Sequence, residues 1–410
     1  MMKRIHYGYI IVMCLFLVMF VIVGLTMSCA GIFYKPVSEE LGTAVGKFGL
    51  YMSLNFLFST LFLSFAGKLI ERYSARIILT LCSAITGCVF MSMSWFHSLW
   101  EFYLAGALFG IALAFLLYLG LPTLLNRWLQ SRMGLFIGIC SAGSGLGGVL
   151  FNPLAGYLIS EYGWRTAYLI FGLIILLLVT PILGIFLRNY PKDKGLEPYG
   201  AIQKNPEQLA HNNSQNENSG IAYECAVRMF PFYAMIVFAF LMNGAATLNV
   251  FLPVYIQNIE FSLEEASFVA SAAMVGVTTG KVGLGMINDR STMMGVCVTT
   301  LFGMSGILLL LMGHIHIILS VTGGFLFGWA YAGVSVQTPL LVREIFGNRN
   351  YARIYSNVSM AIAIGGAIAV GGWGLLADAT SYRFVFCTGF GFLLVSALIG
   401  IYVLKFNKYK

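Results

Sequence analysis

The most unusual residue in this chain is a lysine inside an apolar stretch. Lys281 lies within residues 263–287, eight positions before Asp289 at one end of that stretch (289 − 281 = 8). If the stretch is a helix that crosses a bilayer, the ammonium group lies about 12 Å from that end. A charge at such a depth costs at least about 2.5–3.5 kcal/mol, so we expect Lys281 to face a cavity and to meet a group of opposite charge.

The acidic residues of the chain are not placed to offer that group. All 16 Asp and Glu residues fall at the ends of apolar stretches or between them, and none is expected at the depth of Lys281. An anionic ligand such as a carboxylate would supply the charge. In the alternative interpretation, the four-carbon side chain of Lys281 reaches the nearer membrane surface and stays hydrated there.

Four further side chains near the middle of apolar stretches suit a carboxylate site. Tyr118 would donate a phenol hydrogen bond while its ring lines an apolar wall, and Asn243 and Asn357 would donate from their amides. Trp329 lies near mid-stretch as well. We expect these residues to bind a substrate together with Lys281. Alternatively, each forms a hydrogen bond between helices or anchors the chain at the membrane surface.

Two parts of the sequence repeat at a constant offset of 218 positions. The stretch Gly67-Lys68-Leu69-Ile70-Glu71-Arg72 returns as Gly285-Met286-Ile287-Asn288-Asp289-Arg290 (285 − 67 = 218). Gly163-Trp164-Arg165 returns as Ser381-Tyr382-Arg383 (383 − 165 = 218). Matches in one register predict two halves of like structure, a plan that is typical of transporters with the substrate between the halves.

The repeated stretch has a mechanical interpretation. A glycine allows two helices to approach closely, and charges at a helix end can form a network that holds a gate shut. We therefore expect a conformational role for Gly67, Glu71, Arg72, Arg76, Asp289 and Arg290. The alternative is that these charges only set the orientation of the chain in the membrane.

Composition places the chain among polytopic membrane proteins. Of 410 residues, 59% are hydrophobic and 10% are charged, whereas a soluble protein carries roughly 25% charged residues. Backbone polar groups in lipid must be satisfied within their own segment, so we expect helices. We predict an all-α membrane protein with twelve transmembrane helices, over residues 7–33, 48–68, 77–95, 99–126, 133–159 and 165–187, then 230–256, 263–287, 292–312, 315–341, 352–376 and 383–404.

The distribution of Lys and Arg predicts that both termini are cytoplasmic. Of the 24 basic residues, all but Lys35, Lys47, Arg165, Arg383 and Lys281 would then lie in inner segments, as the positive-inside rule requires. We expect a multi-pass protein of the plasma (inner) membrane. Its parts would be an N-terminal six-helix bundle at residues 1–187, a flexible cytoplasmic linker at 188–228 and a C-terminal six-helix bundle at 229–410.

Other classes of function find little support in the residues. The five histidines lie at the ends of apolar stretches or in loops, and the eight cysteines show no metal-site or disulfide spacing. We expect no enzymatic activity, no cofactor and no metal. The net charge of +8 comes from short segments between apolar stretches, so the expected partners are the lipid bilayer and a small anion, not nucleic acid.

The repeated motif resembles one family in particular. Gly67-x-Leu69-x-Glu71-Arg72-x-x-x-Arg76 is similar to the loop signature of the major facilitator superfamily, with Glu in place of the commoner Asp. The stretch from Tyr118 to Tyr168, with Arg127-Trp128 and Gly163-Trp164-Arg165, resembles the monocarboxylate transporters and the oxalate/formate antiporters, as do residues 191–200. This resemblance implies the major facilitator fold of two pseudo-symmetric six-helix bundles and transport by alternating access.

The resemblance also implies a role for Lys281. In these relatives a basic residue in the eighth span, usually Arg, binds the substrate carboxylate, and Lys281 stands at that position. Lys is a point charge and cannot form the planar bidentate pair that Arg forms. Residues 355–359 lack the second cation of the oxalate carrier, and Val277 stands where proton-coupled relatives carry an acid. A single carboxylate is therefore favoured over two, and simple proton symport is disfavoured.

These observations predict a monomeric secondary active or facilitative transporter of a small organic anion, with a monocarboxylate favoured. The coupling ion would be a proton or a counter-anion, which makes the chain a symporter or an antiporter. Two alternatives stay open. An efflux carrier for amphipathic or drug-like solutes would not need Lys281, and a non-transporting membrane receptor or sensor would use residues 188–228 to recruit a partner.

Overall fold

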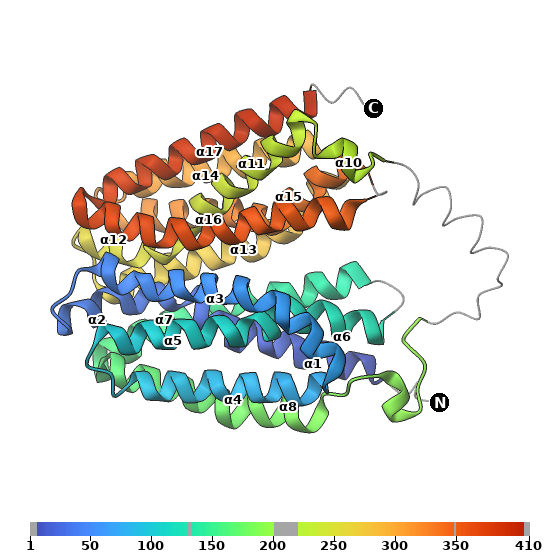
Figure 1. Ribbon diagram of the computed structural model, residues 1–410. Coiled ribbons are helices and arrows are strands. Elements are labelled where there is room, and N and C mark those ends of the chain that lie inside the picture. Colours follow the sequence, from blue (N-terminus) through green and yellow to red (C-terminus); the bar gives the residue numbers. More distant parts are fainter. Residues whose placement is uncertain (1–5, 130–132, 201–219, 348–349, 406–410) are drawn as a thin grey trace, which may run out of the picture. The chain divides into compact units, whose positions relative to one another are not determined.

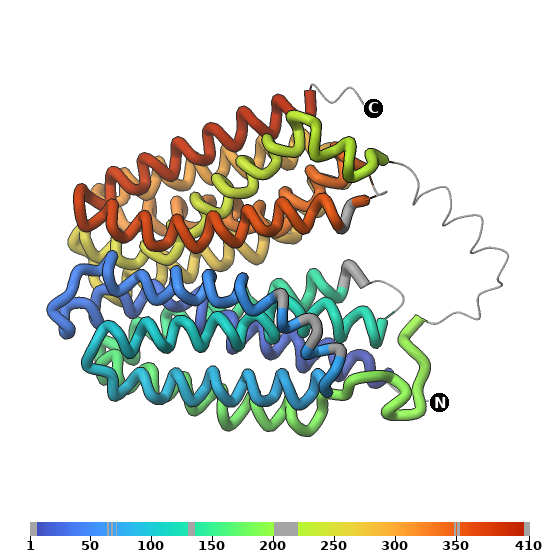
Figure 2. The backbone as a smooth tube through the Cα atoms, in the orientation of Figure 1, coloured from blue at the N-terminus to red at the C-terminus, as the bar shows by residue number. Residues whose placement is uncertain are grey.

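A computed structural model describes the chain over residues 6–129, 133–200, 220–347 and 350–405. Within these ranges the chain is almost wholly helical (Figure 1), which confirms the predicted all-α class. The chain divides into two compact units, Met1–Ile202 and Gln203–Lys410. The path of the backbone through each unit can be followed by colour in Figure 2.

Unit 1 begins with an interrupted span. α1 (Gly8–Leu17) continues as a π-helical stretch (Val18–Ser28), a 3₁₀ turn (Ala30–Phe33) and α2 (Tyr34–Glu40). The remaining elements of this unit are α3 (Val45–Arg72), α4 (Ala75–Met93), α5 (Leu99–Leu113), the π-helical η3 (Ala114–Gly120), α6 (Leu121–Trp128), α7 (Met133–Ile174), the π-helical η4 (Ile175–Val179) and α8 (Thr180–Phe186).

The helical stretch that contains α7 crosses the membrane twice. The stretch Phe136–Phe186 has 51 residues, which corresponds to about 76 Å of helix, more than twice the thickness of the hydrocarbon core. The break falls at Gly163, whose φ of 80° and ψ of 159° are not helical. Only glycine adopts this conformation without strain, so Gly163 marks the turn between two crossings.

Unit 2 is built from a matching series of helices. A short helix, α10 (Tyr223–Ala226), precedes its first span, which is again interrupted by a 3₁₀ turn. The elements of the spans are α11 (Phe230–Ala246), η6 (Thr247–Val250), α12 (Leu252–Asn258), α13 (Leu263–Arg290), α14 (Thr292–Leu311), α15 (Ile317–Phe346), α16 (Tyr351–Ala379) and α17 (Tyr382–Lys405).

The helix boundaries of the two units repeat at the offset found in the sequence. α3 and α13 begin at 45 and 263 and end at 72 and 290, a difference of 218 at both ends (263 − 45 = 290 − 72 = 218). The stretch from α5 to α6 and the helix α15 begin at 99 and 317 and end at 128 and 346, again 218 apart (317 − 99 = 346 − 128 = 218). The two units therefore share one plan of helices.

The number of crossings follows from these helices. In the described part of the chain, 10 helical stretches are long and apolar enough to cross a membrane. One of them, Phe136–Phe186, accounts for two crossings, and the 28-residue α3 is long enough to supply a further one. The count becomes twelve (10 + 1 + 1 = 12), six to a unit, as the sequence predicts.

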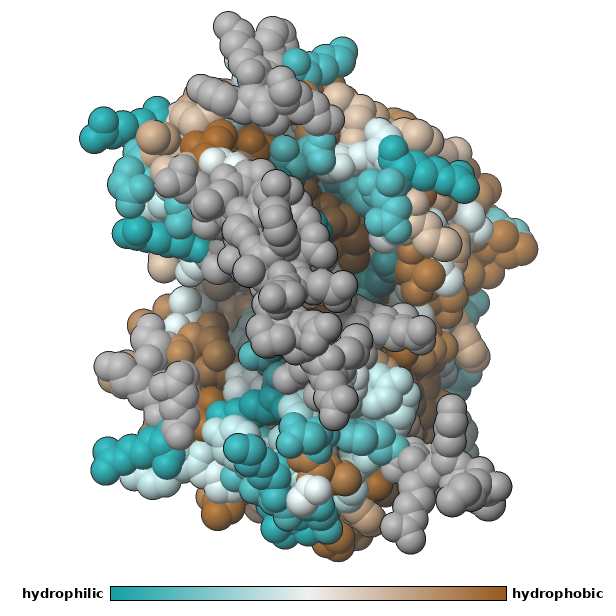
Figure 3. All heavy atoms as spheres, turned by 90° about the vertical axis from the view of Figure 1, so that its right-hand side faces the viewer, coloured by the Kyte–Doolittle hydropathy of each residue, from teal (hydrophilic) through white to brown (hydrophobic). Residues whose placement is uncertain are grey.

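Both ends of the polar stretch between the units are folded against their own unit. In unit 1, Tyr199 N donates to the Trp128 carbonyl at 2.9 Å, and the Trp128 indole donates to the Arg188 carbonyl at 3.1 Å. In unit 2, Ile221 N donates to the Phe346 carbonyl at 2.9 Å. These hydrogen bonds order segments that the polar composition predicted to be flexible, whereas residues 201–219 lie outside the described ranges. Figure 3 views the ends of the units that carry these segments, where hydrophilic side chains gather.

Candidate functional site

Lys281 lies on α13 against the helix that carries Trp329. α13 and α15 pack together in unit 2, and Gly280 and Gly283, which flank the lysine, face the indole of Trp329. A Cβ on Gly283 would overlap the six-membered part of that ring, and a Cβ on Gly280 would lie 3.1 Å from the Trp329 Cα. Glycine at these positions therefore allows the indole to lie directly beside the helix turn of Lys281, whose side chain is half-buried.

The indole of Trp329 carries a buried donor. Its Nε1–H has no hydrogen-bond acceptor among the residues that the structure describes, and its ring contacts Phe302 of α14 with 5.2 Å between centroids. Trp373 in the same unit shows the ordinary arrangement, since its indole donates to the Gly244 carbonyl at 2.8 Å. A buried donor without an acceptor costs about 1–3 kcal/mol.

The predicted amide donors are engaged within unit 2. Asn243 is 8% exposed, and its Nδ2 donates to the Ile362 carbonyl of α16 at 2.7 Å. Asn357 Nδ2 donates to the Arg353 carbonyl one turn earlier in α16, at 2.9 Å. Asn243 thus forms the hydrogen bond between helices that was the alternative interpretation, whereas the bond of Asn357 stays within one helix. Within unit 2 the structure thus places Lys281 and Trp329 side by side. Tyr118 belongs to η3 of unit 1 and is 37% exposed.

The charged residues near the end of α3 make contacts that the sequence did not indicate. Arg76 Nε donates to the Gly184 carbonyl in α8 at 2.7 Å, a favourable place for a cation at a helix C-terminus. The Arg72 guanidinium lies 5.7 Å from the centre of the Tyr73 ring. Gly67 and Glu71 belong to the last turns of α3, but the charge network expected for Glu71 falls on a side chain outside the described structure.

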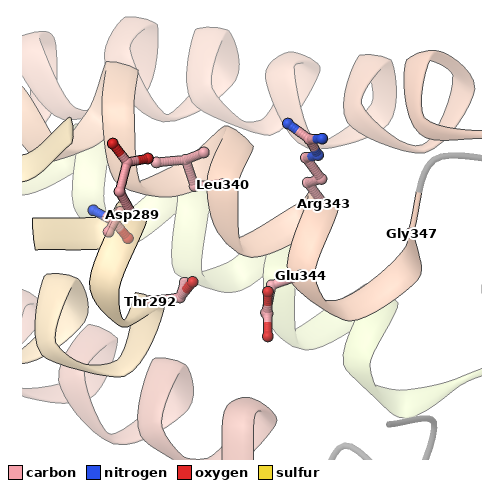
Figure 4. Close-up of a pocket in the computed structure, with 7 residues that line it drawn as sticks. Asp289, Thr292, Leu340, Arg343, Glu344 and Gly347 are labelled. Atoms are coloured by element: carbon pink, nitrogen blue, oxygen red, sulfur yellow. The ribbon is translucent and has the colours of Figure 1, made fainter. Parts of the chain in front are cut away.

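In unit 2, Asp289 lines a pocket of about 330 Å³ where α13 and α15 end and α14 begins (Figure 4). The other residues of its wall are Asn288, Thr292, Leu340, Arg343, Glu344 and Gly347. Figure 4 shows the side chains of Arg343 and Glu344 pointing to opposite sides of α15. Arg290, the last residue of α13, is exposed. The pocket is thus lined by charges of both signs, at the end of unit 2 where the repeated motif lies.

Beside this pocket a pair of buried amides ties three helices together. Asn288 Nδ2 donates to Gln337 Oε1 at 2.9 Å, and Gln337 Nε2 donates to the Thr292 carbonyl at 3.2 Å. The contacts join α13, α15 and α14. Asn288 stands directly before Asp289 in the repeated motif, and this position is the sequence signal that could have identified it.

A cation inside a span, repeated helix units and discontinuous first spans together define the class of membrane carriers with internal repeats. A family model described as Major Facilitator Superfamily matches residues 16–322 and 234–409. The chain therefore belongs to the major facilitator superfamily and is a multi-pass membrane transporter, which confirms the family predicted from the motif at residues 67–76.

Individual relatives are distant. Monocarboxylate transporter 12 of Homo sapiens is 26% identical over 349 residues, which cover 77% of this chain and 65% of that protein, less than two thirds of its length. The uncharacterised MFS-type transporter YhjX of Escherichia coli (strain K12) is 25% identical over 353 residues, with 82% and 80% covered. A crystal structure of a variant of the nucleoside transporter NupG has a TM-score of 0.74 at 12% identity, with 97% and 99% covered. That last likeness concerns the fold alone.

Proposed function

We propose that this transporter carries a small monocarboxylate and that Lys281 and Trp329 bind the carboxylate group. The observation that carries the proposal is the indole N–H of Trp329, which is buried without an acceptor among the described residues and lies against the helix turn of Lys281. A carboxylate offers two oxygens and accepts well from an ammonium group and from an N–H donor. The similarity to a protein named monocarboxylate transporter supports the same class of substrate.

Binding of the anion would make the carrier easier to close. A lysine inside a span is costly because its charge is removed from water, and a bound carboxylate neutralises that charge. Transport would proceed by alternating access of the two units. Tyr118, Asn243 and Asn357 remain candidates to orient the substrate, and the two amides would donate to it from the second N–H of Nδ2 or after release of their present acceptors. Exchange of one anion for another and proton-coupled uptake both fit this scheme, and neither requires enzymatic chemistry.

The test is uptake of radiolabelled carboxylates into proteoliposomes, with and without a pH gradient. We expect Lys281→Ala to lower uptake at least about tenfold, because a hydrogen bond to a charged group contributes about 1.5–3 kcal/mol. Lys281→Arg should keep uptake and change the preferred anion, since guanidinium binds two oxygens in one plane. Trp329→Phe should raise the KM, because it removes the N–H donor while keeping an aromatic side chain at this position.

Two matched variants control this experiment. Lys47→Ala removes an exposed lysine at the start of α3, and Trp100→Phe removes an indole N–H from a side chain that is 78% exposed. Both should transport like the wild type. Carboxylate uptake by Lys281→Ala at the wild-type rate would contradict the site, and uptake of amphipathic cations in place of carboxylates would favour an efflux carrier.

A further inference from the structure

Three segments of unit 1 meet at the turn that follows Gly163. Arg165 at this turn pairs with the carboxylate of Glu40, the last residue of α2, through Nη1 and Oε1. The indole of Trp164 donates to the other oxygen of the same carboxylate. The Arg165 guanidinium also lies 4.1 Å from the centre of the Trp164 ring. The Gly163-Trp164-Arg165 motif thus turns the chain and holds α2, the end of the first span, through the Glu40 carboxylate.

The other terminal nitrogen of Arg165, Nη2, reaches the connection between α4 and α5. Arg165 Nη2 donates to the Phe96 carbonyl at 3.2 Å and lies 3.3 Å from Nδ1 of His97. Glu101 holds this connection in place, because its Oε2 accepts from His97 N at 2.7 Å and from Ser98 N at 2.8 Å. We call the contacts of Arg165 with Glu40, Phe96 and His97, together with Trp164, the latch.

The protonation state of His97 decides whether its contact with Arg165 can form. Neutral imidazole with an unprotonated Nδ1 accepts a hydrogen bond from Arg165, whereas imidazolium has no acceptor there and sets a second positive charge beside the guanidinium. Imidazole changes its charge between about pH 5 and pH 8. The charged groups that contact His97 are Arg165 from α7 and Glu101 from α5, whereas Glu40 from α2 contacts Arg165. Protonation would also attract the Glu101 carboxylate toward the imidazole.

We propose that His97 is a proton-binding site that controls the latch and so regulates the mobility of the end of the first span. When His97 binds a proton, the contact with Arg165 is lost and the pair with Glu40 weakens, so that α2 separates from the turn at Gly163 more often. In the predicted orientation the latch lies at the outer surface and responds to external pH. The proposal concerns regulation and does not depend on the identity of the substrate.

The latch belongs to unit 1 alone. At the offset of 218, Arg165 corresponds to Arg383, but Glu40 corresponds to Asn258 (40 + 218 = 258) and His97 to Ile315 (97 + 218 = 315). The second unit therefore has the arginine without the carboxylate and without the imidazole. An exposed histidine of the corresponding connection in unit 2, His314, provides a matched control, because it lies between α14 and α15.

Hydrogen exchange of the full chain in detergent micelles, read by mass spectrometry, tests the proposal without any substrate. The peptide to follow covers residues 34–44. Its exchange rates are corrected for the effect of pH on the intrinsic rate of amide hydrogen exchange. Between about pH 7.5 and about pH 5.5 we expect exchange to rise about two- to fivefold, because partly exposed ion pairs contribute about 0.2–1 kcal/mol. His97→Gln, which accepts a hydrogen bond but does not titrate, should remove this response.

Two other variants complete the test. Arg165→Gln should exchange fast at both pH values, because it loses the pair with Glu40, and His314→Gln should respond to pH as the wild type does. Equal exchange of the wild type at the two pH values would overturn the proposal, and so would an unchanged response in His97→Gln. Neither result would bear on carboxylate uptake, so failure of the latch and failure of the transport proposal are separable.

Discussion

At the scale of single residues, neighbours decide what a side chain does. Trp329 and Trp373 are both tryptophans of unit 2, yet one indole is buried without an acceptor among the described residues and the other donates to a carbonyl. Gly283 lets Trp329 lie beside the turn of Lys281. These differences make Trp329 a candidate for substrate binding and give Trp373 a structural role.

Gly163 permits a residue-scale prediction about stability. Its φ of 80° and ψ of 159° belong to a region that only glycine occupies freely. Nothing lies within 4 Å of a Cβ built there, so backbone strain alone would oppose a side chain. Gly163→Ala should destabilise the protein by about 1–3 kcal/mol, seen as a lower melting temperature in detergent.

The control for this prediction is Gly372→Ala. Gly372 lies within the helix α16 and also has open space around its Cβ position, so alanine there should be neutral or slightly stabilising. Equal melting temperatures of Gly163→Ala and the wild type would show that the turn does not need a glycine.

At the scale of elements, each unit depends on a few polar ties between otherwise apolar helices. The amide pair Asn288 and Gln337 joins α13, α14 and α15 close to the pocket of Asp289. Arg76 joins the start of α4 to α8 through the Gly184 carbonyl. Each tie includes a residue near a helix end, Asn288 in α13 and Arg76 in α4, and so holds that end against a neighbouring helix, while the apolar faces supply most of the packing.

Replacement of Gln337 tests the amide tie. Gln337 is fully buried. Gln337→Leu would remove Oε1, which accepts from Asn288, and Nε2, which donates to the Thr292 carbonyl. We expect a loss of about 1–3 kcal/mol in stability, because buried polar groups lose their partners. Thermal unfolding in detergent would measure it. Asn357→Leu, which breaks only a bond within one helix, should cost less, and an equal or larger cost there would argue against the tie.

At the scale of the whole molecule, one arrangement of helices is used twice. In each unit the first span is interrupted by a 3₁₀ turn, at Ala30–Phe33 in unit 1 and at Thr247–Val250 in unit 2. The chain enters and leaves each unit after an even number of crossings, so the termini and the linker are expected on one side. The bias of Lys and Arg predicts that this side is the cytoplasm.

Labelling of single cysteines in intact cells tests this orientation. In a background without the other cysteines, Cys225, which is exposed near the end of the linker, should resist a membrane-impermeant maleimide. Ser98→Cys, in the connection between α4 and α5, should react with it. Both should react after the cells are made permeable. The reverse pattern would place the termini outside and the latch inside.

The sequence alone determined the superfamily, the helical class and the repeat. Apolar length fixes which segments can cross a bilayer, and the offset between Gly67 and Gly285 reappears in the boundaries of α3 and α13. The residues of the candidate site could also be recognised in the sequence, since a lysine such as Lys281 is unusual within an apolar stretch. These features are local in sequence, because they depend on composition, spacing and charge.

Only the tertiary structure decided which of these residues meet. The contact of Trp329 with the glycines that flank Lys281, the amide pair of Asn288 and Gln337, and the latch all join segments distant in the chain. In the same way, Asn243 proved to be engaged with α16. Hydrogen bonds and burial depend on which helix faces pack together, and one sequence without its fold does not specify those faces.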